Sequence, residues 1–101
     1  MSKTVTVTVA MSVKPDALAT MMGMIPGLLT GMLERPGVLG GRALQNPAEP
    51  TKLLFIDEFE TVEASEAYFK WRGERGDLDR LGALLTAPPQ VQIWPASIPA
   101  G

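Results

Sequence analysis

The stretch from Glu34 to Glu60 constrains the fold of this chain more than any other part of the sequence. Pro36-Gly37 ends a helix pattern, because proline lacks a backbone N–H and glycine readily takes the left-handed conformation that follows a last helical turn. Two extended runs follow, over about 38–46 and about 52–60, and the polar and proline-rich turn between them favours chain reversal. This order predicts a helix followed by two antiparallel strands.

Residues 4–13 alternate in character, and the alternation predicts the first strand. Apolar and mostly β-branched side chains occupy every second position, as in a strand with one buried face. The buried face would hold Val5, Val7, Val9, Met11 and Val13.

Apolar side chains recur at helical spacing between Pro15 and Pro36, and they predict a helix with one buried stripe. The opposite face holds small or apolar residues such as Gly23 and Gly27, where an exposed helix normally carries charges. That face is expected to pack on another subunit or to line a pocket. The buried stripe consists of Leu18, Met21, Met22, Ile25, Leu28, Leu29 and Met32.

After the two central strands, Thr61 is suited to cap a second helix. A short third helix is expected from Asp77, and a last strand over Val91 to Trp94. The inward stripe of the second helix is predicted to be Ala64, Ala67, Tyr68 and Trp71. A solvated surface is predicted for Arg72, Glu74, Arg75, Asp77, Asp79 and Arg80.

The element order β-α-β-β-α-(α)-β predicts an α+β, ferredoxin-like fold, in which a four-stranded antiparallel sheet has its helices on one face. A chain of 101 residues makes one domain, expected over residues 1–95, with residues 96–101 as a C-terminal tail. The other sheet face would stay open. We therefore expect a homodimer, formed by contact between two open sheets.

The composition excludes several function classes. The chain has no cysteine and no histidine, so it can form neither a thiolate nucleophile, nor a Ser-His-Asp triad, nor a histidine-ligated haem. Its net charge is −2, without a block of basic residues, which argues against a nucleic-acid partner.

A membrane location is also not expected. The uncharged run from Ala17 to Leu33 is at the short limit for a span of ~20 residues, and it contains glycines and Pro26. The N-terminus enters the strand pattern at once, which predicts no signal peptide. We expect a cytoplasmic protein.

Four sequence pieces resemble the antibiotic biosynthesis monooxygenase family, of the dimeric α+β barrel superfamily. They are Val13-Lys14-Pro15-Asp16 after the first strand, Glu34-Arg35-Pro36-Gly37 before the second, Asp57-Glu58-Phe59-Glu60-Thr61 at the end of the third, and Tyr68 on the second helix. Their order is that of the family, and the resemblance covers residues 4–94.

The resemblance implies a reaction without metal, flavin or haem, so no cofactor is expected. A phenolic or quinol-type aromatic substrate, once deprotonated, would itself reduce dioxygen inside a dry apolar pocket. Phe59 stands at the family's tryptophan position, and Tyr68 stands where relatives have a histidine or another aromatic residue. Haem degradation is not expected, because Val9 occupies the position of the asparagine that this branch requires and the chain lacks histidine.

The candidate catalytic residues are Tyr68, Arg42 and Asp57. Tyr68 can donate to a substrate oxygen, Arg42 can stabilise a phenolate, and a buried Asp57 would be a base with raised pKa. The alternatives are a half-buried aromatic, a salt bridge from Arg42 to Asp57 or Glu58, and a structural ion pair. The candidate substrate-binding residues are Phe59, Trp71, Trp94, Val9 and Met22, all of which can also serve as core.

Two other functions fit the same pattern. One is a non-catalytic dimeric barrel that binds a small hydrophobic ligand or only assembles. The other is an isomerase or cyclase on the same scaffold, which would need an acid/base pair but no oxygen. A fold alone does not decide among them.

Overall fold

A computed structural model of the chain describes residues 4–100. Met1 to Lys3, of the predicted domain, and Gly101, of the predicted tail, lie outside the described residues. The same three N-terminal residues are most of the stretch from which the absence of a signal peptide was predicted. The elements are β1 (Val5–Ser12), the 3-10 turn η1 (Pro15–Ala17), α1 (Leu18–Leu33), β2 (Val38–Asn46), β3 (Glu49–Phe59), α2 (Val62–Glu74), α3 (Asp77–Gly82) and β4 (Gln90–Trp94).

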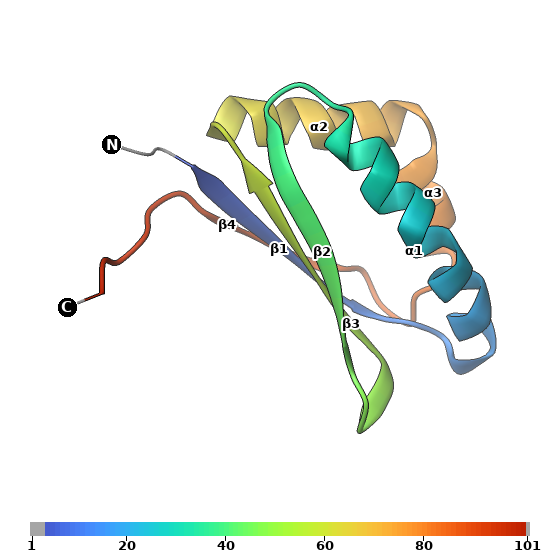
Figure 1. The fold of residues 1–101 in the computed structure, drawn as a ribbon. Coiled ribbons are helices and arrows are strands. Elements are labelled where there is room, and N and C mark those ends of the chain that lie inside the picture. The colour runs from blue at the N-terminus through green and yellow to red at the C-terminus, as the bar shows by residue number, and fades with distance from the viewer. Residues whose placement is uncertain (1–3, 101) are drawn as a thin grey trace.

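The four strands form one antiparallel sheet in the order β2-β3-β1-β4, with the helices on one face (Figure 1). This is the predicted ferredoxin-like α+β fold. β3 begins at Glu49, earlier than expected, because the strands join through a tight turn in which Asn46 Oδ1 accepts a hydrogen bond from Ala48 N–H.

The core lies between the helices and the inner face of the sheet. The predicted alternation of β1 is confirmed, since Val5, Val7, Val9, Met11 and Val13 are all buried. β3 contributes the inner-face residues opposite them, because each residue of β1 pairs with one residue of β3. Buried side chains of β3 and α1 complete this layer: Leu53, Phe55, Asp57, Phe59, Met21, Ile25 and Met32.

Three details of the helices differ from the sequence-based expectation. Met22 is exposed rather than part of the buried stripe of α1, and Ala67 is exposed rather than on the inner face of α2. Arg72 and Asp77 were expected on a solvated surface, but both are buried, where they form an ion pair and Arg72 also donates to the Leu28 carbonyl of α1.

The segment Pro15–Leu33 is long and apolar enough to cross a membrane by length and composition, a test that the core helix of a soluble protein also passes. Met21, Ile25 and Met32 on this segment pack in the core. Its opposite face, which includes Gly23 and Gly27, is exposed.

Two glycines permit close packing of the helices against the sheet and the loop that precedes β2. Gly37 has φ +77°, and a Cβ on it would lie 2.5 Å from Cβ of Ala64. A Cβ on Gly41 would lie 2.7 Å from the sulfur of Met32 and 3.5 Å from Oδ1 of Asp57. Neither position accommodates a larger residue without movement of its neighbours.

Within residues 4–100, no helix covers the second face of the sheet (Figure 1). Residues that pair side by side across the strands share this face, among them Thr8, Ile56 and Arg42. Beyond β4, the segment 95–100 is extended and exposed and projects away from the body of the domain.

Candidate functional site

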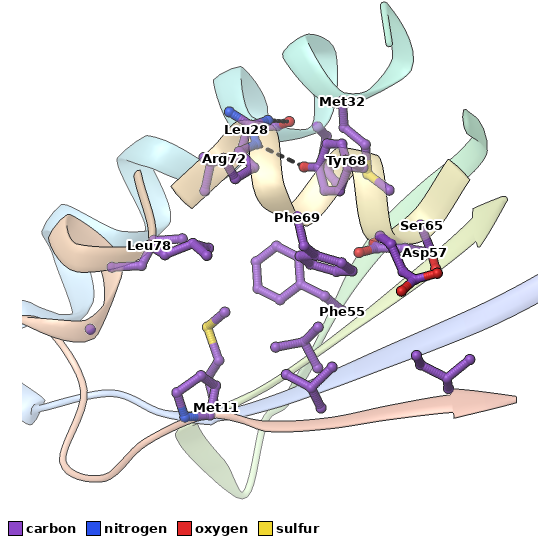
Figure 2. Close-up of a pocket in the computed structure, with 18 of the residues that line it drawn as sticks. Met11, Leu28, Met32, Phe55, Asp57, Ser65, Tyr68, Phe69, Arg72 and Leu78 are labelled. Atoms are coloured by element: carbon purple, nitrogen blue, oxygen red, sulfur yellow. Dashed lines mark hydrogen bonds between the residues drawn. The ribbon is translucent and has the colours of Figure 1, made fainter. Parts of the chain in front are cut away.

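A cavity of about 480 Å³ lies between the inner face of the sheet and the helices. This volume is within the range of small-molecule sites. Its wall is mostly apolar, with a few polar side chains from β3 and α2 (Figure 2). The lining residues are Val9 and Met11 of β1, Leu28, Leu29 and Met32 of α1, Phe55 and Asp57 of β3, Ser65, Glu66, Tyr68, Phe69 and Arg72 of α2, Leu78, Leu81 and Gly82 of α3, and Leu85, Pro89, Val91 and Ile93 beyond it.

Asp57 is a carboxylate on the apolar face of the sheet. It pairs with Val7 of β1 on one side and with Gly41 of β2 on the other, so its side chain points toward the helices. It is 4% exposed, and no group among residues 4–100 donates a hydrogen bond to its buried Oδ1. An unpaired buried carboxylate is unfavourable, which makes the protonated form easier to reach.

The pKa of Asp57 is raised from 3.8 to about 7. Burial is the main cause, and the negative charge of Glu58 adds to it, whereas the positive charge of Arg72 lowers the pKa in part. Asp57 is therefore divided between its acid and carboxylate forms near neutral pH, as suits a general base or acid.

Arg72 and Tyr68 form the second polar group of the cavity. They lie four residues apart on α2, so they occupy the same side of the helix. Arg72 Nε donates to the Tyr68 hydroxyl oxygen at 2.8 Å, and Arg72 Nη2 donates to the Leu28 carbonyl of α1 at 2.7 Å (Figure 2). Because Tyr68 accepts this hydrogen bond, its own O–H proton is left to donate.

Tyr68 keeps its proton at neutral pH. Burial raises the pKa of its hydroxyl above the ordinary value of 10.0, and the hydrogen bond from Arg72 lowers the pKa only in part. The pairing with a buried guanidinium also polarises the O–H bond, which strengthens Tyr68 as a donor. The site thus holds a carboxyl group and a phenol donor on two different elements.

Asp77 also holds Arg72 in place, through a different nitrogen of the guanidinium group from the one that binds Tyr68. Its Oδ2 accepts from Arg72 Nη1 at 2.9 Å and from Arg75 Nε at 3.0 Å, and its Oδ1 accepts from Arg80 Nη2. Burial alone would raise the pKa of Asp77, but these hydrogen bonds outweigh it and lower the pKa. Asp77 is therefore ionised and balances the charge of Arg72.

Aromatic rings pack beside this network. The ring of Tyr68 contacts those of Phe59, Phe69 and Trp71, with centroids 5.2 to 6.1 Å apart. Arg35 stacks over the outer indole of Trp71 with its guanidinium carbon 4.3 Å from the ring centroid. This packing restricts the motion of the Tyr68 ring.

The structure brings together part of the predicted site. Val9, Asp57 and Tyr68 line the cavity, as does Phe69, which was not among the candidates. Phe59 is fully buried and packs behind Tyr68 instead of lining the cavity wall.

Four of the predicted residues lie elsewhere. Trp71 is next to Tyr68 on the arginine side and does not line the cavity, and Met22 is exposed on α1. Arg42 pairs with Ile56, one position out of phase with Asp57, so it projects from the open sheet face. Trp94 is on the same face, where its Nε1 donates to Thr8 Oγ1 at 2.9 Å.

The sequence reasoning missed Arg72 and Asp77. Their charges suggested a solvent-exposed turn, but the four-residue spacing from Tyr68 to Arg72 was a usable signal. Among residues 4–100, no group of three or more Asp, Glu, His or Cys side chains is placed to hold a metal ion.

Comparison with known proteins gives a family match. Residues 4–73 match the family model described as antibiotic biosynthesis monooxygenase. No curated protein matches the sequence.

Solved structures of similar fold cover almost the whole chain. A conserved protein from Methanosarcina mazei is 16% identical, with a TM-score of 0.86 over 95% of each chain. A variant of SnoaB, described as a cofactor-independent oxygenase from Streptomyces nogalater, is also 16% identical, with a TM-score of 0.82 over 96% of each chain. The protein Rv0793 from Mycobacterium tuberculosis is 19% identical, with a TM-score of 0.79 over 97% of this chain and 99% of its own. At these identities the similarity establishes the fold.

Proposed function

The chain belongs to the antibiotic biosynthesis monooxygenase family, and on that basis we propose that it is a cofactor-independent monooxygenase. Its substrate would be an uncharged aromatic ketone or quinol with an acidic hydrogen, of the size of a few fused rings. The observation that carries this proposal is the apolar cavity that contains Asp57 and Tyr68 as separate polar groups. The similarity in fold to a protein described as a cofactor-independent oxygenase supports it.

The reaction balances without an added reductant. A ring CH₂ group loses one proton to Asp57, and the resulting carbanion, which is also a phenolate, transfers electrons to dioxygen. The CH₂ carbon becomes a carbonyl that keeps one oxygen atom, and the second oxygen atom leaves as water. The substrate supplies all four electrons, and both of its lost hydrogens end in that water.

The residues have distinct roles in this scheme. The Asp57 carboxylate takes the proton, for which a pKa of about 7 is suited at neutral pH. Tyr68 donates its O–H to the substrate oxygen, where negative charge develops. Arg72 holds the Tyr68 oxygen at 2.8 Å and adds positive charge nearby. The apolar wall excludes water and accepts the rings.

The test is oxygen consumption with a panel of anthrones and hydroquinones in chelator-treated buffer. We expect uptake with wild-type protein and a loss of about 100-fold in kcat in Asp57→Asn, because general bases contribute on the order of 10² or more. Tyr68→Phe should retain the ring packing while losing the donor. Circular dichroism establishes that each variant is folded.

Glu58→Gln is the matched control for Asp57→Asn. Glu58 is the next carboxylate on β3, but it faces the open side of the sheet, where Thr6 Oγ1 donates to it at 2.8 Å. Its charge is only a secondary cause of the raised pKa of Asp57, so its replacement should leave most of the oxygen uptake in place. Absence of uptake with every compound of the panel would refute the monooxygenase proposal.

We also propose that the protein is a cytoplasmic homodimer, joined through the open sheet face. That face carries large apolar side chains, including Leu44 at 42% and Trp94 at 49% exposure, which a second copy would cover. Analytical ultracentrifugation at micromolar concentration tests this, and a stable monomer would contradict it.

A further inference from the structure

The cavity contains groups that suffice for a second kind of reaction, which needs no oxygen. It holds one buried carboxyl group and one phenol donor within an otherwise mostly apolar wall. These are the groups that move a proton within a ketone: a base to take and return the proton, and a donor to stabilise the enolate oxygen. An oxygenase uses them for its first step alone.

The arrangement of the two groups indicates which ketone they fit. In Figure 2 the Tyr68 hydroxyl points toward Arg72 and Leu28, on the side of its ring away from Asp57. A substrate that meets both groups would place its carbonyl oxygen at Tyr68 and the carbons that lose and regain the proton at Asp57, with a fused-ring skeleton against the apolar wall.

We propose that the protein is also an isomerase, which converts β,γ-unsaturated ketones of fused-ring compounds to their α,β-unsaturated forms. The Asp57 carboxylate takes the proton from the carbon between the carbonyl and the double bond. The C–H electron pair becomes part of a dienolate, whose oxygen accepts a hydrogen bond from Tyr68. Asp57 then returns the proton to the γ carbon, and the double bond moves into conjugation. No oxidant or reductant is consumed, and Asp57 ends as the carboxylate.

The surroundings of Asp57 suit a proton that is taken and given back. The charged or titratable groups around it are Arg72, Tyr68 and the exposed Glu66 of α2, and Glu58 on the far face of β3. Arg72 is already bound to Asp77, so it does not hold Asp57 in the ionised form. The other elements contribute uncharged neighbours, namely Val7 of β1, Gly41 of β2 and Met32 of α1.

The experiment uses a bicyclic β,γ-unsaturated ketone, a hexahydronaphthalenone, under nitrogen. Ultraviolet absorbance follows the conjugated product, and proton NMR in D₂O reports whether deuterium enters the γ carbon. We expect isomerisation by the wild-type protein, with a rate that rises with pH as Asp57 ionises through its pKa of about 7. If one base returns the same proton, part of the hydrogen removed from the α carbon should appear at the γ carbon in place of deuterium.

Asp57→Asn is expected to lower the rate by about 100-fold or more, and Tyr68→Phe by about 100-fold, in line with the loss of a general base and of an oxyanion donor. Asp79→Asn, an exposed carboxylate on α3, should leave the rate unchanged. If Asp57→Asn does not fold, Tyr68→Phe and the pH profile of the wild type still test the assignment. Equal rates in wild type and Tyr68→Phe, or a rate independent of pH, would overturn it.

The inference uses the site of the proposed monooxygenase, but the two can fail separately. Oxygen uptake without anaerobic isomerisation refutes the isomerase and leaves the monooxygenase. Isomerisation without uptake on any anthrone or hydroquinone supports the isomerase and refutes the monooxygenase. Neither activity in folded protein refutes both.

Discussion

Replacement of Asp57 by asparagine should make the protein more stable at neutral and higher pH, because the buried carboxyl group of Asp57 destabilises the folded state there. The raised pKa means that the folded state binds a proton at this site more tightly than the unfolded chain does. Between 3.8 and about 7 the folded protein therefore loses stability from this group as the pH rises. Below the unfolded pKa of 3.8 both states are protonated, and the penalty is absent.

The magnitude follows from the size of the shift. A rise from 3.8 to about 7 is roughly 3 pKa units, and each unit corresponds to about 1.36 kcal/mol. The full penalty is thus on the order of 4 kcal/mol above the folded pKa. This is a large share of the 5–15 kcal/mol that typically stabilises a domain. Asparagine has nearly the same shape and does not ionise, so Asp57→Asn removes the penalty.

Chemical denaturation of wild type and Asp57→Asn between about pH 4 and about pH 8 measures the effect. Tryptophan fluorescence can follow unfolding, because Trp71 lies in the helical layer. The difference in unfolding free energy, variant minus wild type, should grow by about 4 kcal/mol across this range. All samples need the same protein concentration, because association also changes apparent stability.

Asp79→Asn, on the exposed side of α3, controls for the loss of one negative charge. A difference between Asp57→Asn and wild type that stays constant from acid to alkaline pH would refute the reasoning. It would mean that the folded state stabilises the Asp57 carboxylate as well as water does. The proposed base would then have an ordinary pKa, and its role in both reactions would weaken.

Further predictions concern the supporting structure. Gly37→Ala should destabilise the protein by more than about 1 kcal/mol, because of the positive φ and the contact with Ala64. Gly23→Ala, on the exposed face of α1, should stabilise the protein by about 0.5–1 kcal/mol. Urea denaturation measures both variants, and equal effects on the unfolding free energy would contradict the packing argument. Asp77→Asn should lower the unfolding free energy by about 3 kcal/mol, because it leaves the buried charge of Arg72 without its partner. It should also shift the pH–rate profile to lower pH, as the freed guanidinium acts more strongly on the cavity; an unshifted profile would show that the two carboxylates are independent.

Local patterns in the sequence were sufficient to predict the architecture. The alternation of β1 placed Val7 and its neighbours inside, and Thr61 caps α2 as expected, accepting a hydrogen bond from Ala64 N–H at 3.0 Å. The order of the elements then led to the observed sheet. These features depend on neighbours in sequence, and periodicity reports them directly.

The polar part of the site was only partly predictable, because it depends on contacts distant in sequence. Arg72 is buried because the Leu28 carbonyl, 44 residues earlier, accepts one of its hydrogen bonds. No local pattern marks such a contact, and the charged run around Arg72 resembles a surface loop. Arg42 lies outside the cavity for a different reason: the strand register puts it opposite Ile56, and a shift of one residue would have placed it inside.

The partner of Arg72 determines what the site can do. If Arg72 were bound to Asp57, the ion pair would lower the pKa of Asp57, and the carboxylate would be a weak base at any physiological pH. Instead Asp77, which does not line the cavity, neutralises Arg72 at 2.9 Å, while Arg75 and Arg80 keep Asp77 ionised. Arg72 can then orient Tyr68 without quenching the base. Because Arg72 pairs with Asp77, Asp57 is left to act as a base. If Arg72 paired with Asp57 instead, the same residues would form only a structural salt bridge.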